Sequence, residues 1–502
     1  MTISKYISKI HLLILAGLVI VYILLNFSTI KQTPIFTDEA IYVRWAQIAA
    51  NDASLRYISL LDGKQPLFIW IAMIPVKIFQ DSLLAVRLLS VIYGLISIFG
   101  IYFIGRNIKN SLAGLLSAAL FVTSPFFFIY NRLAIYESLI STLGIYSLLF
   151  TILLIKKKRI DLAITLGFVS GLGLMTKSSA NFFIYLLPFS PMILIKNIKK
   201  LNKPNTRNTL MVIGLFFLSI TISFTMYNTL RLFPLFNMIE EKNHTFILTN
   251  REFINNPFSL VFGNTPSLLS WIFQYLTPIP FILFILSGIY FLFRKKLPEI
   301  YLLAWIMVPF AATAFFGKII YPRYLLFMVP GIFILISLVI NEFFEKINSY
   351  KFRLLTVAVL FIGPIISLVS ILTNLSNSFI PQSDKNQLIN DWPAGGGIEE
   401  VVKIINSSAE KEKVFVGTEG TFGLLPYALE IELVKNPNVE IKGYYPVKEI
   451  PQEVVDKAKL IKTYFIYNLT QNENQFSDPK IKLVGKYPKG NSDVYLRLFE
   501  VK

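Results

Sequence analysis

Long apolar runs separated by short polar segments dominate the first 375 residues of the chain. An apolar run of roughly 20 residues is long enough to cross a bilayer as a helix. The pattern therefore predicts a polytopic α-helical membrane protein. We expect eleven spanning helices, near residues 10–27, 87–105, 111–130, 138–155, 160–176, 180–195, 209–231, 267–293, 299–316, 323–340 and 353–373.

One further apolar run, "PLFIWIAMIPVKIF" at 66–79, is too short for a usual span and contains Pro75. It is typical of an interfacial or re-entrant helix. With that interpretation and a cytoplasmic N-terminus, the basic segments "KKKR" at 156–159 and "KNIKKLNK" at 196–203 fall on the cytoplasmic side, as the positive-inside rule requires. The loops at 28–86 and 232–266 then lie outside the cell membrane.

The pattern changes after residue 375, where apolar runs shorten and turn residues gather, as in "DWPAGGGIEE". Alternating segments there indicate strands, and two segments indicate helices. We predict two domains: a transmembrane domain at 1–375 and a small extracytoplasmic α/β domain at 380–502. The expected strands lie near 413–418, 439–445, 463–468, 481–486 and 493–501, and the expected helices near 398–408 and 451–459.

Composition agrees with this class, because 54% of the residues are hydrophobic and the mean hydropathy is +0.59. The net charge of +18 is unevenly distributed: residues 380–502 hold 16 Lys/Arg and 17 Asp/Glu, out of 48 and 30 in the whole chain. The excess basic residues lie mainly in short loops between apolar runs, which signals topology and argues against nucleic-acid binding. The chain has no cysteine, so disulfides are excluded.

Charged residues beside the predicted outer ends of the spans gather on one face. The first outer loop reads "KQTPIFTDEAIYVRWAQ", with Asp38 and Glu39 side by side. The same stretch predicts an amphipathic helix whose N-cap is Thr37 or Asp38, so capping is the alternative to a chemical role. The other charged residues of this face include Lys64, Arg132, Glu137, Lys177 and Arg323.

Carboxylates and cations at an outer lipid boundary suit a substrate that is half lipid and half polar, such as a polyprenyl phosphate carrying a sugar. A carboxylate takes the proton from an acceptor hydroxyl as the hydroxyl attacks the anomeric carbon, and cations stabilise the departing phosphate. Asp38 is the candidate base. Lys64, Arg132 and Lys177 are candidate phosphate contacts.

Four motifs resemble the GT-C glycosyltransferases: the Asp-Glu pair in the first outer loop, "GKQPLFIW", "NRLAIYESL" and "GLGLMTKSS". The nearest branches are the protein O-mannosyltransferases and the lipid A aminoarabinose transferases, and the resemblance is clearest over residues 30–180. It implies a polyprenyl-phosphate-linked sugar donor, a protein or glycolipid acceptor, inversion at the anomeric carbon and an extracytoplasmic site in a multi-pass membrane enzyme.

The resemblance also assigns roles to single residues. Asp38 matches the catalytic acidic position of the family, and Glu39 matches its neighbour, which orders the acceptor or the loop. Lys64 and Lys177 match basic positions of the family, and Arg132 matches the second-loop motif together with Glu137. Arg323 lies within "KIIYPRYLLFMVPG", which resembles a later motif with Tyr and Pro at a span start. The expected donor phosphate contacts are Lys64, Arg132, Lys177 and Arg323.

Two positions depart from the family pattern. Gln65 replaces the first proline of the usual pair, and Glu137 stands where the family more often has aspartate. The second departure leaves open whether a divalent metal ion takes part, and the sequence implies no other cofactor.

Two hypotheses from other classes compete with the enzyme. A transporter or flippase of lipid-linked sugars predicts charges near the middle of the bilayer and paired broken helices. A membrane scaffold that displays the C-terminal domain predicts that substitutions in the outer loop have no effect.

Overall fold

A computed structural model describes residues 2–194, 206–347, 349–476 and 478–502. The basic segment expected at 196–203 lies outside these residues. Helices form most of the described chain. Their bounds are α1 Thr2–Ser28, α2 Thr37–Asn51, α3 Leu67–Ile78, α4 Ser82–Ile108, α5 Ser111–Val122, α6 Pro125–Tyr130, α7 Glu137–Lys157, α8 Ile160–Leu174, α9 Asn181–Tyr185, α10 Thr206–Asn228, α11 Met238–Phe246, α12 Asn250–Asn255, α13 Val261–Leu276, α14 Pro278–Phe293, α15 Leu297–Phe316, α16 Val329–Lys346, α17 Tyr350–Thr373, α18 Gln382–Lys385, α19 Ile398–Ala409, α20 Tyr427–Leu433 and α21 Gln452–Ala458.

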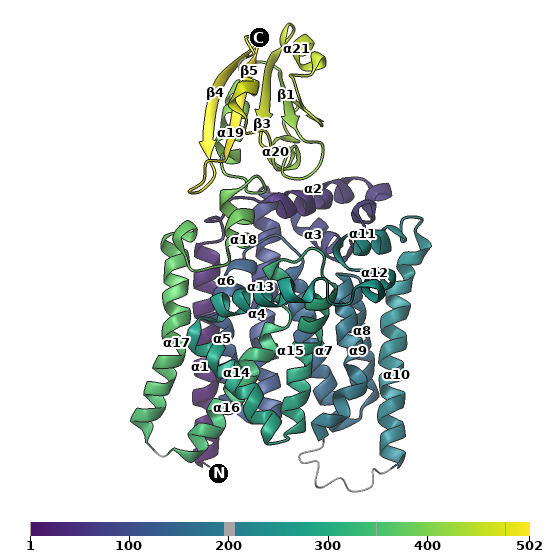
Figure 1. Ribbon diagram of the computed structural model, residues 1–502, viewed down its shortest axis with the longest axis vertical. Helices are drawn as coiled ribbons and strands as arrows, with labels where there is room; N and C mark the ends of the chain where they lie inside the picture. Colours follow the sequence, from purple (N-terminus) through teal and green to yellow (C-terminus); the bar gives the residue numbers. More distant parts are fainter. Residues whose placement is uncertain (1, 195–205, 348, 477) are drawn as a thin grey trace.

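Within the described residues, six helices are long and apolar enough to cross a membrane: α1, α4, α7, α10, α15 and α17. They run roughly parallel in one bundle (Figure 1), and each overlaps a predicted span. The helices α3, α5 and α8 are apolar but shorter. The polytopic membrane class is therefore confirmed, whereas the count of eleven crossings stays a prediction.

The span predicted at 267–293 is wrong as a single straight helix. The helices α13 and α14 meet there at a bend of 119°, as a broken span or a re-entrant loop. Thr277 between them has a φ of 68°, and Pro278 begins α14 without the N–H that a continuous helix needs. The predicted span at 111–130 is also not one continuous helix, because α5 ends at Val122 and Pro125 begins α6.

The C-terminal residues form a five-stranded mixed sheet in the order β2-β1-β3-β5-β4. β1 pairs in parallel with β2 and β3, while β5 pairs antiparallel with β3 and β4. The strands and helices predicted after residue 380 are present, and α18 and α20 are additional short helices that the pattern does not predict. The strand bounds are β1 Val414–Glu419, β2 Val439–Tyr444, β3 Lys462–Tyr467, β4 Ile481–Pro488 and β5 Tyr495–Val501.

The helix α2 lies across the end of the bundle, directly beneath the sheet domain (Figure 1). It packs against α3 and α20, and most of its residues are buried. It is therefore covered on both sides rather than amphipathic. The predicted N-cap is also wrong: the cap position is Phe36, whose backbone N–H donates to Glu39 at 3.3 Å, because the Thr37 hydroxyl donates instead to Pro393 O.

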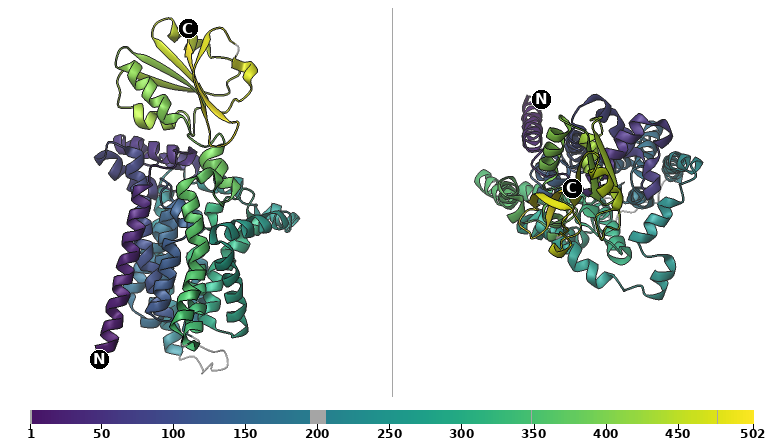
Figure 2. Two further views of the ribbon diagram at one scale, coloured as in Figure 1. Left: turned by 90° about the vertical axis from the view of Figure 1, so that its left-hand side faces the viewer. Right: turned by 90° about the horizontal axis from the view of Figure 1, so that it is seen from above.

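The start of α1 and the sheet domain lie at opposite ends of the molecule (Figures 1 and 2). An orientation that places the sheet outside the cell therefore places the start of α1 in the cytoplasm. The choice between the two orientations, and the domain limits at residues 375 and 380, stay predictions.

Candidate active site

Four charged side chains from distant parts of the sequence meet beneath α2. Arg323 donates from Nη2 to Asp38 Oδ2 at 2.9 Å, and its Nε lies 3.5 Å from Glu137 Oε1. Lys177 Nζ lies 3.2 Å from the same Glu137 oxygen. The structure therefore brings together Asp38, Glu137, Lys177 and Arg323, which the sequence analysis selected separately, and we name these four residues the Asp38 cluster.

Lys64 approaches the cluster from a short helical turn before α3. Its Nζ lies 3.2 Å from Asp62 Oδ2 and 4.8 Å from the centre of the Tyr42 ring. Asp62 also accepts from Lys242 at 2.5 Å. The Lys64 charge contributes to the electrostatics of Asp38 through space, so Lys64 belongs to the same site without touching the Asp38 carboxylate.

The surroundings of Asp38 hold it in its charged form. Burial raises the pKa of Asp38, but the positive charges of Arg323, Lys64, Lys177 and Lys242 together outweigh burial and lower it below its ordinary value. Burial lowers the pKa of Lys177, and nearby Glu137 partly offsets this effect. The site is thus a carboxylate surrounded by an excess of cations.

Glu39 is adjacent to Asp38 in sequence but lies outside the cluster. Its carboxylate is fully buried and accepts two hydrogen bonds from the Arg87 guanidinium, at 2.8 and 2.7 Å. It also accepts the backbone N–H of Ala134 at 2.7 Å. Arg87 donates further to the carbonyl oxygens of Ile30 and Thr33. Glu39 therefore joins the loop between α1 and α2, α4 and the loop before α7.

Arg132 also lies apart from the Asp38 cluster. It is buried, with 2% of its surface exposed, and its guanidinium donates to Phe128 O at 2.8 Å, to Thr29 O at 3.0 Å and to Thr29 Oγ1 at 2.8 Å. It stacks on the Phe128 ring at 3.7 Å. The structure thus separates Arg132 from the other predicted phosphate contacts.

Sequence reasoning missed several residues at this site. Arg87 had a readable signal, because an arginine at the start of an apolar span needs a partner. Asp62 and Lys242 had none, since they lie 180 residues apart in the chain and only the fold brings them together. Asp384 in α18 is buried and accepts from Tyr275, and burial raises its pKa to about 6.

The site does not suit a divalent cation. In the part of the chain that the structure describes, no group of three or more histidine or acidic side chains is arranged to hold a metal ion. Asp38 and Glu137 are the nearest carboxylates, and both already face Arg323. Each of the three carboxylates at the site, Asp38, Glu137 and Asp62, is paired with a lysine or an arginine, so they form ion pairs rather than a set of metal ligands.

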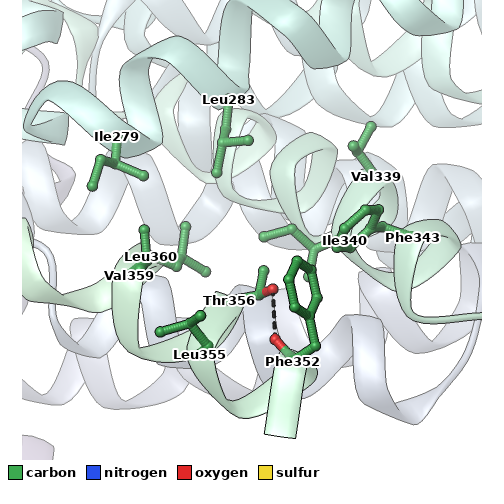
Figure 3. Close-up of a pocket in the computed structure, with 10 residues that line it drawn as sticks. All are labelled: Ile279, Leu283, Val339, Ile340, Phe343, Phe352, Leu355, Thr356, Val359 and Leu360. Carbon is green, nitrogen blue, oxygen red and sulfur yellow. Dashed lines mark hydrogen bonds between the residues drawn. The ribbon is translucent and has the colours of Figure 1, made fainter. Parts of the chain in front are cut away.

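A second feature is an apolar groove of about 400 Å³ between α14, α16 and α17. Figure 3 shows aliphatic and aromatic side chains lining it, with the Thr356 hydroxyl bonded to its own helix at Phe352 O. It contains none of the charged residues of the Asp38 cluster. This groove is therefore separate from the charged site at α2.

The fold and the cluster together define the class of this protein, a multi-pass membrane protein with a group of paired charged side chains at one end of its helices. Residues 63–224 match the family described as dolichyl-phosphate-mannose-protein mannosyltransferase. That segment carries Lys64, Glu137 and Lys177. Among curated protein sequences, none is similar enough to count as a match.

Solved structures support the same class. ArnT from Cupriavidus metallidurans in the apo state has a TM-score of 0.60 at 12% identity, with 100% of this chain and 98% of that chain covered. ArnT bound to undecaprenyl phosphate has a TM-score of 0.56 at 12% identity, with 97% of each chain covered.

The Archaeoglobus fulgidus oligosaccharyltransferase AglB, in complex with an inhibitory peptide and a dolichol-phosphate, has a TM-score of 0.53 at 12% identity, with 92% of this chain and 70% of that chain covered. All these proteins are GT-C glycosyltransferases. The GT-C resemblance inferred from the motifs is thereby confirmed at the level of the fold.

Proposed function

We propose that this protein is a glycosyltransferase that moves a sugar from a polyprenyl-phosphate-linked donor to a hydroxyl of an extracytoplasmic protein or glycolipid. The observation that carries the proposal is the partly exposed Asp38 carboxylate, 21% of whose side chain is accessible, 2.9 Å from Arg323 and within a group of cations. The family match and the similarity to ArnT bound to undecaprenyl phosphate support the donor class.

The reaction is a single displacement. Asp38 accepts the proton of the acceptor hydroxyl while the hydroxyl oxygen forms a bond to the anomeric carbon. The bond from that carbon to the phosphate oxygen breaks, and the electron pair leaves with the polyprenyl phosphate. One displacement inverts the anomeric configuration. Arg323, Lys177 and Lys64 stabilise the growing negative charge on the phosphate.

Arg323 has two roles in this scheme. In the structure its guanidinium neutralises Asp38, which keeps the pKa of Asp38 low and makes the carboxylate a weak base. A donor phosphate is a stronger bidentate partner for arginine and competes for the same guanidinium. When Arg323 turns to the phosphate, Asp38 loses its main compensating charge, so burial raises its pKa and makes it a better base.

Glu39 and Arg132 act as positioning residues in this proposal. The Glu39 carboxylate is fully occupied by Arg87 and by backbone N–H groups, and Arg132 holds Thr29 at the end of α1. Arg87 compensates the charge of Glu39, and the Arg132 guanidinium is buried and donates to neutral oxygens away from the Asp38 cluster. We therefore assign the chemistry to Asp38 and the donor phosphate to Arg323, Lys177 and Lys64.

The test is a transfer assay with purified full-length protein in proteoliposomes that contain polyprenyl-phosphate-linked sugars. Asp38→Asn keeps the size of the side chain but removes its basicity, so kcat should fall by about 10²–10⁴-fold. The matched control is Asp52→Asn, an exposed acid at the end of the same helix, which should transfer sugar at the wild-type rate.

Wild-type activity in the Asp38→Asn protein would refute the role of Asp38 as base. A wild-type protein that moves labelled donor between leaflets but transfers no sugar would instead support the transporter hypothesis. Mass spectrometry of glycans and glycolipids from cells that lack the protein would identify the sugar and the acceptor.

A further inference from the structure

The segment 391–397, "DWPAGGG", runs between the sheet domain and the start of α2, and we name it the connecting segment. The backbone N–H of Thr37 donates to Pro393 O at 3.0 Å, and the Thr37 hydroxyl donates to the same oxygen at 3.1 Å. Phe36 and Ala394 form an antiparallel bridge. The connecting segment is therefore hydrogen-bonded to Thr37, the residue that immediately precedes Asp38.

On its other side, the connecting segment is held by a buried lysine of the sheet domain. Lys489 is fully buried, and its ammonium donates to Trp392 O at 3.0 Å, to Ala394 O at 2.6 Å and to Asn468 Oδ1. Three acceptors match the three N–H donors of a lysine. Lys489 thus binds the two carbonyl groups that flank Pro393, whose own carbonyl binds Thr37.

Asn468 is itself fixed in place. Its amide nitrogen donates to Trp392 O at 3.0 Å, and its backbone N–H donates to the Glu419 carboxylate at 2.9 Å. Glu419 stands at the end of β1 and also accepts the backbone N–H of Leu469 at 2.7 Å. A continuous chain of hydrogen bonds therefore leads from the sheet through Lys489 and the connecting segment to Thr37.

The packing around the connecting segment leaves little freedom for a shift. A Cβ atom added to Gly395 would lie 2.3 Å from Ile35 O, closer than any real contact allows. The neighbouring Gly396 is less crowded, because an added Cβ would lie 3.3 Å from its nearest atom, Pro488 O. The backbones of residues 35 and 395 are therefore in direct contact.

A buried ammonium without a carboxylate in hydrogen-bonding contact is costly, and an apolar side chain of the same size would avoid that cost. The three directed hydrogen bonds of the Lys489 ammonium instead hold the connecting segment in one position. Displacement of a catalytic group by about 1 Å can reduce a rate by about 10²-fold. Precise placement of Asp38 is thus a role that such a lysine can serve.

We propose that Lys489 is a positioning residue for Asp38, through which the sheet domain fixes the start of α2 relative to the donor-binding cations. This inference rests on the proposed function, because it assumes that Asp38 is the base. It gives the sheet domain a defined task in catalysis, 451 residues after Asp38 in the chain.

The test compares Lys489→Met with Lys482→Met, an exposed lysine of β4, in the full-length protein. In the transfer assay, Lys489→Met should lower kcat by about tenfold or more, while KM for the donor stays within about twofold, because Lys64, Lys177 and Arg323 are untouched. Hydrogen–deuterium exchange of residues 36–45 should accelerate in Lys489→Met and not in Lys482→Met.

Gly395→Ala gives a second test that leaves the buried lysine intact, with Gly396→Ala as its matched control. It should show the same loss of kcat and the same faster exchange at residues 36–45, and it decides the question if Lys489→Met fails to fold. Wild-type kcat in folded Lys489→Met and Gly395→Ala would overturn the proposal, as would lower kcat with unchanged exchange.

Failure of this inference is distinguishable from failure of the proposed function. If Asp38→Asn is active, the proposed function fails whatever the connecting segment does. If Asp38→Asn is inactive while Lys489→Met and Gly395→Ala transfer sugar normally, only the positioning role of Lys489 fails.

Discussion

Two adjacent carboxylates at the start of α2 each face an arginine, yet the two pairs lie in different surroundings. In the Glu39–Arg87 pair the side chains are 0% and 3% exposed, whereas in the Asp38–Arg323 pair they are 21% and 10% exposed. Glu39 is also held by backbone N–H groups from two segments. The same kind of ion pair therefore occurs twice. We call the fully buried Glu39–Arg87 pair the sealed pair and the partly exposed Asp38–Arg323 pair the open pair.

This difference separates a structural role from a chemical one. A sealed carboxylate whose oxygens are all bonded has no position left for a substrate proton, and breaking its pair leaves a buried charge. In an open pair the arginine can move from the carboxylate to a phosphate and keep its number of hydrogen bonds. Adjacent acids in a motif can thus divide positioning and catalysis between them.

The largest effect should follow from breaking the sealed pair. Arg87→Met leaves Glu39 charged and unpaired, so the free energy of unfolding should fall by about 3–5 kcal/mol. Thermal unfolding of purified protein in detergent measures this loss. The double variant Arg87→Met with Glu39→Gln should recover part of the stability, since the unpaired charge is gone. Wild-type stability of Arg87→Met would show that the pair is not a structural element.

Removal of Arg323, the arginine of the open pair, should impair turnover more than folding. Arg323→Met deletes a cation from the leaving phosphate, so kcat should fall by about 10²–10³-fold. Because burial is then opposed by fewer charges, the pKa of Asp38 in the free enzyme should rise. The acidic limb of the kcat/KM profile of the residual activity should therefore move to higher pH.

Arg323→Lys is the matched control for charge. It keeps the positive charge beside Asp38 and should leave the acidic limb near its wild-type position, although the bidentate contact is lost. An unchanged acidic limb in Arg323→Met would contradict the competition between Asp38 and the donor phosphate for Arg323.

The apolar pattern was enough to predict the membrane class and the elements of the sheet domain, because both depend on the local periodicity of side chains. It did not predict the bend at Thr277, because a count of apolar residues takes no account of Pro278, the residue that begins α14. Bends depend on local backbone geometry that an apolar count does not see.

The motifs led to five of the residues that meet at the site: Asp38, Lys64, Glu137, Lys177 and Arg323. They pointed to Asp38 as the base and to Glu39 as its neighbour, but they did not predict that Arg132 lies apart from Arg323, because similar residues differ only in what the fold places beside them. The residue that pairs with Glu39 and buries its charge is Arg87, 48 residues further along the chain.

A third buried charge, Lys489, contrasts with both pairs because carbonyl groups and an amide surround it. Burial lowers the pKa of Lys489 from 10.5 to about 7, and Asp391 opposes this only weakly. Between these values the unfolded chain binds more protons than the folded one, so stability should rise with pH by about 1.4 kcal/mol per unit.

The measurement is thermal unfolding of the full-length protein at pH 7.5 and pH 9.5. The rise in stability between these values should be smaller in Lys489→Met than in the wild type, while Lys482→Met should keep the wild-type rise. Equal pH dependence in all three proteins would show that Lys489 is charged to the same extent in the folded and unfolded states.

The smallest effect should come from an exposed pair next to the sealed one. Lys31 and Asp81 lie 2.7 Å apart, with 67% and 37% of their side chains exposed. Water and salt screen such a pair, so a double-mutant cycle of Lys31→Met and Asp81→Asn should give a coupling of only about 0.2–1 kcal/mol. Asp81 also caps α4 by accepting the Leu84 N–H, and the asparagine oxygen preserves that cap.

Salt dependence then distinguishes the exposed pair from the sealed pair. The Lys31–Asp81 coupling should decrease when the salt concentration is raised, because mobile ions screen exposed charges, whereas the Glu39–Arg87 coupling should not change. If both couplings decreased equally, water and ions would have to reach Glu39. The distinction between Glu39 as the buried carboxylate that positions α2 and Asp38 as the partly exposed carboxylate that accepts the proton would then be wrong.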